Sequence, residues 1–251
     1  MSLPRLITIP FSHYCEKARW ALEYAGVAFT EEAYLPPFHA PVSLRAGGTR
    51  QVPLLIEDDG VFPDSTAIMQ WASRKATPER GLYGDTEAER REIEAFEAQL
   101  DKDLGPHTRR LVYFHLLRNT GLLMKLASPG AQPWQLVSFT VMLPLLRVVL
   151  RKSLDITPAS TERSLTKIGT TFARVGERLL DGRPFLVGTR LSAADLTFAS
   201  LAAPVLFPSR YGARLPSVDA LPSELRARVQ AWREHPAGRW ALGIYEQYRN
   251  T

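Results

Sequence analysis

Cysteine is almost absent from this sequence, since Cys15 is the only one among 251 residues. A single thiol excludes an internal disulfide framework and any zinc site built on cysteines, and the histidines show no ligand spacing. We therefore expect no metal. The scarcity of cysteine suits a reducing compartment, and the first residues show no secretory signal pattern, so we expect a cytoplasmic protein.

Runs of one charge and low-complexity segments are also absent. The chain has 31 basic and 26 acidic residues, a net charge of +5, spread along its length. Without a basic run interleaved with aromatic residues, nucleic-acid binding is not expected, and affinity for anionic small molecules is the milder interpretation. A composition of 45% hydrophobic and 23% charged residues suits two modest globular domains.

The most informative stretch lies between residues 6 and 26. A run rich in β-branched residues over 6–9 ends at Pro10, and a helical pattern follows until Gly26, a residue typical of a helix C-terminus. Ser12 and Cys15 therefore fall where a strand passes into a helix N-terminus. Free backbone N–H groups and the positive end of the helix dipole at such a junction favour a thiolate.

Strand and helix patterns alternate up to about residue 78. Strand candidates are 27–34, 52–57 and 61–62, with a hairpin turn at 58–60, a weakly indicated helix in 36–48 and a helix capped at 64–65. Beyond a linker at 77–81 the pattern is helical, with candidates at 87–104, 111–127, 134–153, 157–180, 222–234 and 237–248. This order predicts an α/β thioredoxin-like domain over 1–78 and an all-α domain over 85–251.

Two helix starts in the second half carry clear capping signals. Thr157 precedes Pro158, which gives an N-cap followed by proline at the first helical position, and Gly182 ends that pattern. Ser192 stands three residues before Asp195, which predicts a capping box at the start of a further helix.

The Ser12-x-x-Cys15 junction followed by Ala-Arg-Trp-Ala-Leu at 18–22 resembles the glutathione transferases. The segment Phe185–Asp195 resembles the buried capping segment of the same family, so the resemblance covers nearly the whole chain. It implies a cytosolic, bacterial-like member of the Ser type, with a thioredoxin-like domain followed by an all-helical domain. It also implies glutathione as co-substrate, a hydrophobic electrophile as second substrate, and a homodimer.

The resemblance assigns roles to Ser12 and Cys15. Ser12 occupies the position of the family's catalytic serine or cysteine, where its hydroxyl donates to the glutathione sulfur; the alternative is a simple helix cap. Cys15 lies one turn inside the helix. It is either a thiol that forms a mixed disulfide with glutathione or a small buried side chain, and burial is the favoured interpretation.

The same resemblance implies the glutathione-binding residues. Val52–Pro53 resembles the family's cis-proline, whose preceding residue aligns the glutathione backbone. Arg50 and Gln51 are candidates for the glycyl carboxylate. Ser65, at a helix N-terminus, is expected to hold the γ-glutamyl carboxylate, and Asp64 to bind the ammonium. Asp64 stands where the family usually has Glu or Gln, so its contact with the ammonium is a departure.

Other residues of the junction and of the helical half allow two interpretations. His13 is either a charged imidazole that acts on the thiolate or a solvent-facing loop histidine, and the second is the favoured interpretation. Lys17 and Arg19 are expected to support nearby carboxylates or face solvent. Four apolar residues are candidates for the electrophile wall, although such spacing is more typical of core: Tyr113, Phe114, Leu117 and Trp134. Residues 134–150 are apolar enough to suggest a buried or dimer-face helix, with peripheral contact of 134–152 with an anionic membrane as the alternative.

Two further functions stay open at this point. A thiol–disulfide oxidoreductase would work through Cys15. A non-catalytic carrier or partner-binding protein of the same fold would bind glutathione weakly. Two departures from the family's pattern favour it: Asp64, and His13, where the family often has Pro.

Overall fold

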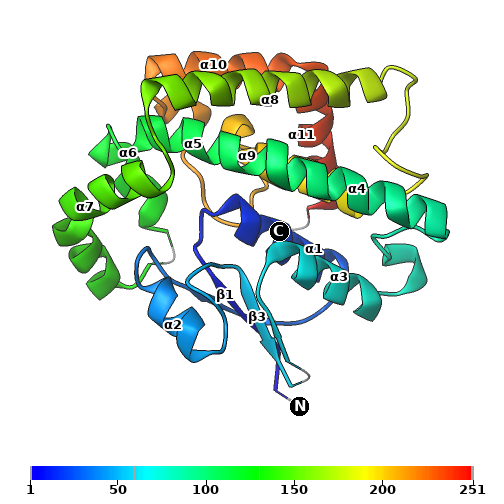
Figure 1. The fold of residues 1–251 in the computed structure, drawn as a ribbon, viewed down its shortest axis with the longest axis horizontal. Coiled ribbons are helices and arrows are strands. Elements are labelled where there is room, and N and C mark those ends of the chain that lie inside the picture. Colours follow the sequence, from blue (N-terminus) through cyan, green and yellow to red (C-terminus); the bar gives the residue numbers. More distant parts are fainter. Residues whose placement is uncertain (1, 59, 130, 250–251) are drawn as a thin grey trace.

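The computed structural model describes residues 2–58, 60–129 and 131–249, and one mixed sheet organises its N-terminal part. The strands are Arg5–Thr8 (β1), Thr30–Ala33 (β2), Leu54–Glu57 (β3) and Gly60–Phe62 (β4), in the order β2-β1-β3-β4. β1 runs parallel to β2 and antiparallel to β3, which pairs antiparallel with β4. This confirms the predicted thioredoxin-like half (Figure 1).

The helices of this half are His13–Tyr24 (α1), His39–Arg45 (α2) and Ser65–Lys75 (α3), followed by the 3-10 turn Pro78–Arg80. Helices α1 and α3 pack against each other between the sheet and the helical half (Figure 1). Gly26, with φ of +72°, ends α1 in the left-handed conformation that its position predicts. Strand β1 is buried from Leu6 to Thr8, so it forms the centre of the sheet's core.

The second half is helical, as predicted. Its elements are Glu87–Asp103 (α4), Gly105–Leu116 (α5), Thr120–Ala127 (α6), Pro133–Ser153 (α7), Pro158–Arg178 (α8), Ala193–Leu206 (α9), the 3-10 turn Val218–Ala220, Ser223–Glu234 (α10) and Pro236–Tyr248 (α11). Helix α9 is buried along nearly its whole length and packs against α1, α4, α5, α10 and α11. The strands lie before the linker, and helices α4–α11 lie after it. The domain boundaries 1–78 and 85–251 stay predictions, and residues 1, 250 and 251 lie outside the described residues.

The capping box at Asp195 fixes the start of α9. Its carboxylate accepts hydrogen bonds from the Ser192 N–H at 2.7 Å, the Ser192 hydroxyl at 2.6 Å and the Leu186 N–H at 2.6 Å. Burial raises the pKa of Asp195 to about 6. These bonds hold the 185–192 segment on the central helix, which makes the segment a structural element.

Several predicted boundaries shift for local reasons. The strand expected at 27–34 shortens to β2, the strand at 52–57 begins only after the cis Val52–Pro53 bond, and the helix at 157–180 ends at Arg178. The apolar stretch 111–127 divides into α5 and α6 because Asn119 caps a new helix, accepting from the Leu122 N–H at 2.9 Å. The hairpin turn includes Asp59, which lies outside the described residues.

Helix α7 is buried along one face only. The expectation of a fully buried helix over 134–150 is wrong, because the buried positions of α7 are Gln135, Phe139, Leu143 and Leu146. The opposite face is exposed. A dimer face on this helix stays a prediction. Helices α6 and α7 extend to one side of the molecule, beyond the end of α5 (Figure 1).

Candidate functional site

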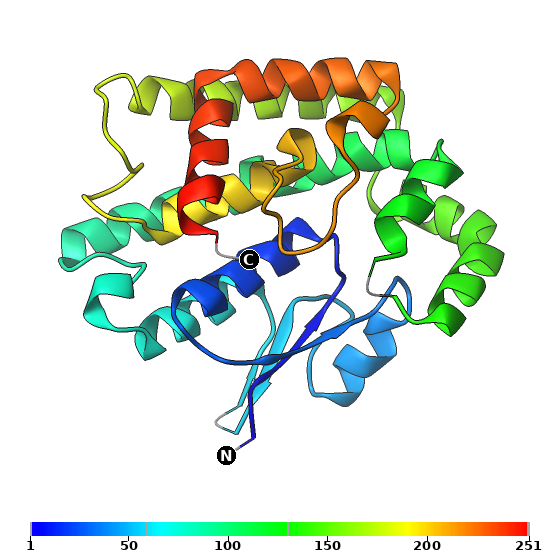
Figure 2. The same ribbon diagram turned by 180° about the vertical axis from the view of Figure 1, so that it is seen from behind.

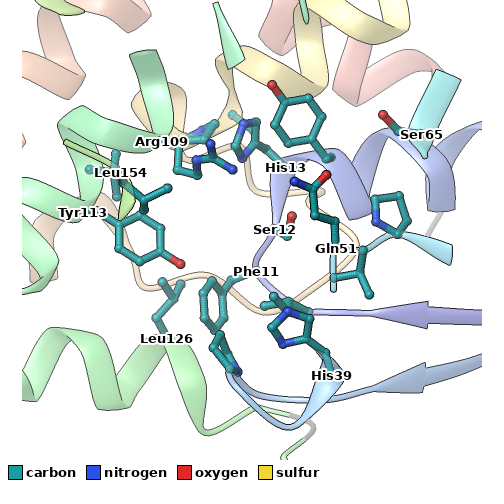
Figure 3. Close-up of a pocket in the computed structure, with 18 of the residues that line it drawn as sticks. Phe11, Ser12, His13, His39, Gln51, Ser65, Arg109, Tyr113, Leu126 and Leu154 are labelled. Atoms are coloured by element: carbon teal, nitrogen blue, oxygen red, sulfur yellow. The ribbon is translucent and has the colours of Figure 1, made fainter. Parts of the chain in front are cut away.

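A cleft of about 550 Å³ lies between the two halves and contains the candidate site (Figure 3). The thioredoxin-like half contributes the loop before α1, the segment before β3 and the start of α3. Helices α5, α6 and α7, together with the C-terminal part of α9 and the segment after it, contribute the other wall. All the predicted site residues except Cys15 line this cleft: Ser12, Arg50, Gln51, Val52, Pro53, Asp64 and Ser65.

Ser12 is the N-cap of α1, and its side chain borders the open space of the cleft (Figure 3). Its hydroxyl oxygen accepts a hydrogen bond from the Cys15 N–H at 3.5 Å. A hydroxyl that accepts one bond still has its own proton to donate. Ser12 therefore caps the helix and presents a donor to the cleft at the same time, so the two roles considered for it are compatible.

Cys15 has a different environment from Ser12. Its side chain is fully buried and does not line the cleft, and its sulfur accepts a hydrogen bond from the Ile9 N–H at 3.4 Å. Burial raises the pKa of the thiol to about 11. A buried, protonated thiol is inert, and this one packs beneath the loop that presents Ser12.

The cis Val52–Pro53 bond is present, as the sequence suggested. The preceding loop is attached to α2, because the Ser43 hydroxyl donates to the Gln51 carbonyl at 3.2 Å. Arg50 and Gln51 are exposed at the rim, while Pro53 is buried. An extended ligand along this edge therefore meets backbone at Val52 and exposed polar side chains at the rim.

Asp64 and Ser65 begin α3 on the same side of the cleft. Asp64 is the N-cap, and its carboxylate accepts from the Ala67 N–H at 2.8 Å while staying exposed. Ser65 is buried at the first helical position. The N-termini of α1 and α3 thus both face the cleft, and their dipoles give it a positive potential that suits an anion.

His13 is not the solvent-facing residue that the sequence suggested. It is 3% exposed, and its Nε2 donates to the Gly105 carbonyl oxygen at 3.0 Å. Burial, and then the positive charge of Arg109, lower the pKa of His13 to about 3. The imidazole is therefore neutral, and because a carbonyl only accepts, Nε2 carries the proton and Nδ1 has the lone pair. The prediction failed because the helical half covers this loop.

Lys17 and Arg19 are both buried and support nearby carboxylates, which is one of the two roles expected for them. Lys17 lies 2.9 Å from Glu97 and 2.8 Å from Asp101, both on α4, and it donates to the Thr66 hydroxyl on α3 at 3.0 Å. This network joins the two halves beneath the cleft, where Thr66 and Asp101 belong to its lining. It fixes the α3 N-terminus relative to the helical wall.

Only Tyr113 of the four predicted wall residues lines the cleft. Leu117 is buried in the core, Phe114 packs against the Arg118 guanidinium, and Trp134 is 54% exposed against Phe38. The other lining residues of the helical half are Asp101, Arg109, Val112, Leu116, Leu126, Leu150, Leu154, Ala203, Pro204, Phe207, Tyr211 and Leu215. Phe114, Leu117 and Trp134 thus do not line the cleft, and Leu117 has the core position that was the alternative for it. Apolar spacing alone does not show which side of a helix faces a cleft.

Arg109 lines the cleft and was not predicted from the sequence. Its guanidinium carbon lies 6.0 Å from the Tyr14 ring centroid, and the side chain points into the cleft beside Tyr113 (Figure 3). Arg109 and Tyr113 are four residues apart and so share a face of α5. That spacing was the available signal. A cation on the helical wall adds to the positive potential of the two helix N-termini.

Comparison with known proteins supports the resemblance. Residues 6–80 match the family model of the glutathione S-transferase N-terminal domain. A comparison with curated proteins gives no match. Among solved structures, a glutathione S-transferase from Xanthobacter autotrophicus Py2 is similar at a TM-score of 0.59 and 15% identity, covering 97% of this chain and 93% of that one.

Two further structures are similar along their whole length. One is a glutathione S-transferase from Methylobacterium radiotolerans JCM 2831 in complex with glutathione sulfonate, at 17% identity and a TM-score of 0.55, covering 96% of this chain and 95% of that one. The other, from Xylella fastidiosa, has 21% identity and a TM-score of 0.54, covering 97% and 98%. The chain as a whole thus has the glutathione S-transferase fold, and residues 6–80 match the N-terminal domain of that family.

Proposed function

We propose that this protein is a glutathione transferase of the Ser type, which activates the thiol of glutathione for attack on a hydrophobic electrophile. The observation that carries the proposal is the position of Ser12, whose hydroxyl borders the cleft at the N-terminus of α1. A thiol with an ordinary pKa near ~8.5 is mostly protonated at neutral pH. A hydroxyl donor and a helix dipole aimed at the sulfur favour the thiolate.

Glutathione is proposed to lie extended along the Val52 edge, with its cysteinyl backbone antiparallel to Val52. The γ-glutamyl carboxylate then reaches Ser65 and the N–H groups at the start of α3, and the glycyl carboxylate reaches Arg50 or Gln51. Asp64 already accepts a bond from the Ala67 N–H, and its exposed second oxygen is available for the ammonium. Each charged end of the peptide thus meets a group of suitable charge or polarity.

The second substrate is proposed to occupy the helical side of the cleft, which Val112, Leu126 and Leu154 make largely apolar. The sulfur attacks an electrophilic carbon there, a carbon–sulfur bond forms, and the displaced group leaves with the electron pair. The thiol proton passes to solvent. The chain contributes a lowered thiol pKa and proximity, with no covalent intermediate. A homodimer and a cytoplasmic location are proposed from the resemblance.

The burial of Cys15 weighs against the oxidoreductase alternative, because a thiol without access to the cleft cannot meet a disulfide. The carrier alternative predicts weak glutathione binding and no turnover. Isothermal titration with glutathione, followed by conjugation to an activated aryl chloride, separates these functions. We expect binding, with turnover that Ser12→Ala lowers and the matched Cys15→Ala variant leaves nearly unchanged. Turnover that depends on Cys15 and not on Ser12 would overturn the proposal.

A further inference from the structure

Helix α7 exposes a continuous apolar stripe. Six of the ten exposed large hydrophobic residues in the described part of the chain lie on this one helix: Trp134 (54%), Val137 (66%), Val141 (76%), Leu145 (63%), Val148 (62%) and Val149 (50%). Their spacings of three and four place most of them along one face of the helix. We refer to these six residues as the α7 stripe. Scattered exposed apolar residues are ordinary, but a contiguous patch marks a contact surface.

The opposite face of α7 is attached to the protein. Phe139, Leu143 and Leu146 are buried, and the Gln135 side-chain oxygen accepts from the Leu35 N–H at 2.9 Å. By length and composition alone, α7 is the one described helix that could cross a membrane. The buried face and the hydrogen bond of the buried Gln135 instead hold the helix against the protein, with the α7 stripe facing outwards.

Cations gather at the C-terminal end of the stripe. Arg151 and Lys152 are exposed and pair with no carboxylate of the described residues, while Arg147 donates to the Thr120 hydroxyl at 2.5 Å. Residues 133–153 contain no aspartate or glutamate. An apolar face with basic residues and no acidic ones is the pattern of a helix that lies in the plane of an anionic membrane interface.

We propose that the α7 stripe docks on an anionic phospholipid surface, with the apolar residues among the acyl chains and Arg151 and Lys152 at the headgroups. The charge distribution favours lipid over a second copy of this chain. A two-fold contact through this face would place the cations of each copy beside the α7 of the other, which has no carboxylate to pair with them.

Docking would also bring the cleft close to the bilayer. Leu150, in the last turns of α7, and Leu154, immediately after it, line the cleft. A hydrophobic electrophile dissolved in the membrane would then have a short path to the helical wall. This consequence rests on the proposed function, whereas docking itself requires neither glutathione nor turnover, so the two can fail separately.

Co-sedimentation with vesicles tests the proposal on the full chain. We expect binding to vesicles of phosphatidylcholine mixed with phosphatidylglycerol, weaker binding to phosphatidylcholine alone, and a loss of binding as salt rises. Arg151→Gln and Lys152→Gln should each weaken binding ~5-fold. Val141→Asp with Leu145→Asp should abolish it. Leu180→Asp is the matched control, because Leu180 is 82% exposed just beyond α8, whose C-terminal end lies on the opposite side from α7 (Figure 1).

Circular dichroism and glutathione titration establish that each variant is folded, so that lost vesicle binding reports the surface. Four results would overturn the proposal. The wild-type protein could ignore anionic vesicles, or Leu180→Asp could weaken binding as much as the stripe variants do. Light scattering could also show a dimer that Val141→Asp with Leu145→Asp dissociates while vesicle binding persists, which would assign the stripe to a second copy. Membrane-bound protein that resists alkaline extraction would make α7 a spanning helix instead.

Discussion

The Nε2 of His13 lies 3.0 Å from the carbonyl oxygen of Gly105, and this hydrogen bond joins the start of α1 to the start of α5. The neighbouring Tyr14 hydroxyl donates to the Asp101 carbonyl at 3.2 Å, so two consecutive residues after Ser12 are held by the helical half. The geometry of the proposed catalytic hydroxyl therefore depends on the interface between the two halves as well as on the thioredoxin-like fold.

Gly105 is required by this close approach. A Cβ added to it would lie 2.2 Å from the Tyr14 hydroxyl oxygen and 2.7 Å from the ring carbon that bears it. We expect Gly105→Ala to lower the free energy of unfolding by about 1–3 kcal/mol, as overpacking does, and to lower conjugation activity. Gly243→Ala is the control, because a Cβ there meets nothing within 4 Å. Urea unfolding measures the stability of both variants. Equal stability of the two would contradict this account.

His13 should make stability depend on pH. Its pKa falls from 6.5 to about 3 in the folded protein, so below pH 6.5 the unfolded chain takes up a proton that the folded protein binds only near pH 3. Stability present above pH 6.5 is therefore lost as the pH falls through this window, by up to about 1.4 kcal/mol per pH unit from this group.

Asp195 acts in the opposite direction between its ordinary pKa of 3.8 and its folded value of about 6, where stability falls as the pH rises. Subtracting the unfolding free energy of His13→Asn from that of wild type at each pH removes the contribution of Asp195, which both proteins share. We expect the variant to have a flatter loss of stability on acidification. The His13 ring resonances should not titrate as the pH crosses 6.5, and a normal titration there would contradict the buried, neutral imidazole.

Cys15 should resist thiol reagents in the folded protein. Its side chain is fully buried, and at its pKa of about 11 almost none is thiolate at neutral pH. We expect labelling by an aromatic disulfide to proceed only as fast as the protein unfolds, and to become rapid in denaturant. Rapid labelling of the native protein, protected by glutathione, would instead return the oxidoreductase function to consideration.

Glu16 should be among the residues most important for stability. It is fully buried and lies 2.7 Å from Arg19 and 2.9 Å from Arg249, and it accepts from the Gly212 N–H at 3.1 Å. Figure 2 shows the end of α11, which precedes Arg249, beside α1. Because removal of one partner leaves buried charge uncompensated, Glu16→Gln should cost about 3–5 kcal/mol.

The matched control for Glu16 is Glu87→Gln. Glu87 forms an exposed pair with Arg91 one helical turn away, at 3.0 Å, and such pairs contribute about 0.5 kcal/mol or less. Thermal and urea unfolding measure both changes. Equal effects of the two substitutions would contradict the structural role of the buried cluster.

The sequence predicted the parts of the molecule that local patterns determine. The strand-to-helix junction at Ser12, the left-handed Gly26 and the capping box of Asp195 depend on residues close in the chain, and all three are present. The sequence-based family resemblance also led to the cis Val52–Pro53 bond. Of these features, the Ser12 junction and the Val52–Pro53 bond belong to the candidate glutathione site.

The sequence did not predict what the contact between the two halves decides. His13 is buried by α5, about 90 residues later in the chain, and Arg109 and Tyr113 face the cleft because of how α5 packs. The exposure of the α7 stripe is of the same kind, since an apolar helix has the same pattern whether its face is covered or free. Long-range packing, which no local spacing encodes, determines all three.

The central claim is that Ser12 stabilises the thiolate of bound glutathione. Its most direct test is a pH titration of the ultraviolet absorbance of that thiolate, for wild type and Ser12→Ala. We predict that wild type lowers the thiol pKa clearly below the free value, that Ser12→Ala restores it, and that kcat falls about 10²-fold with the lost donor. A bound thiol with an unshifted pKa, or the same shift in both proteins, would contradict the account.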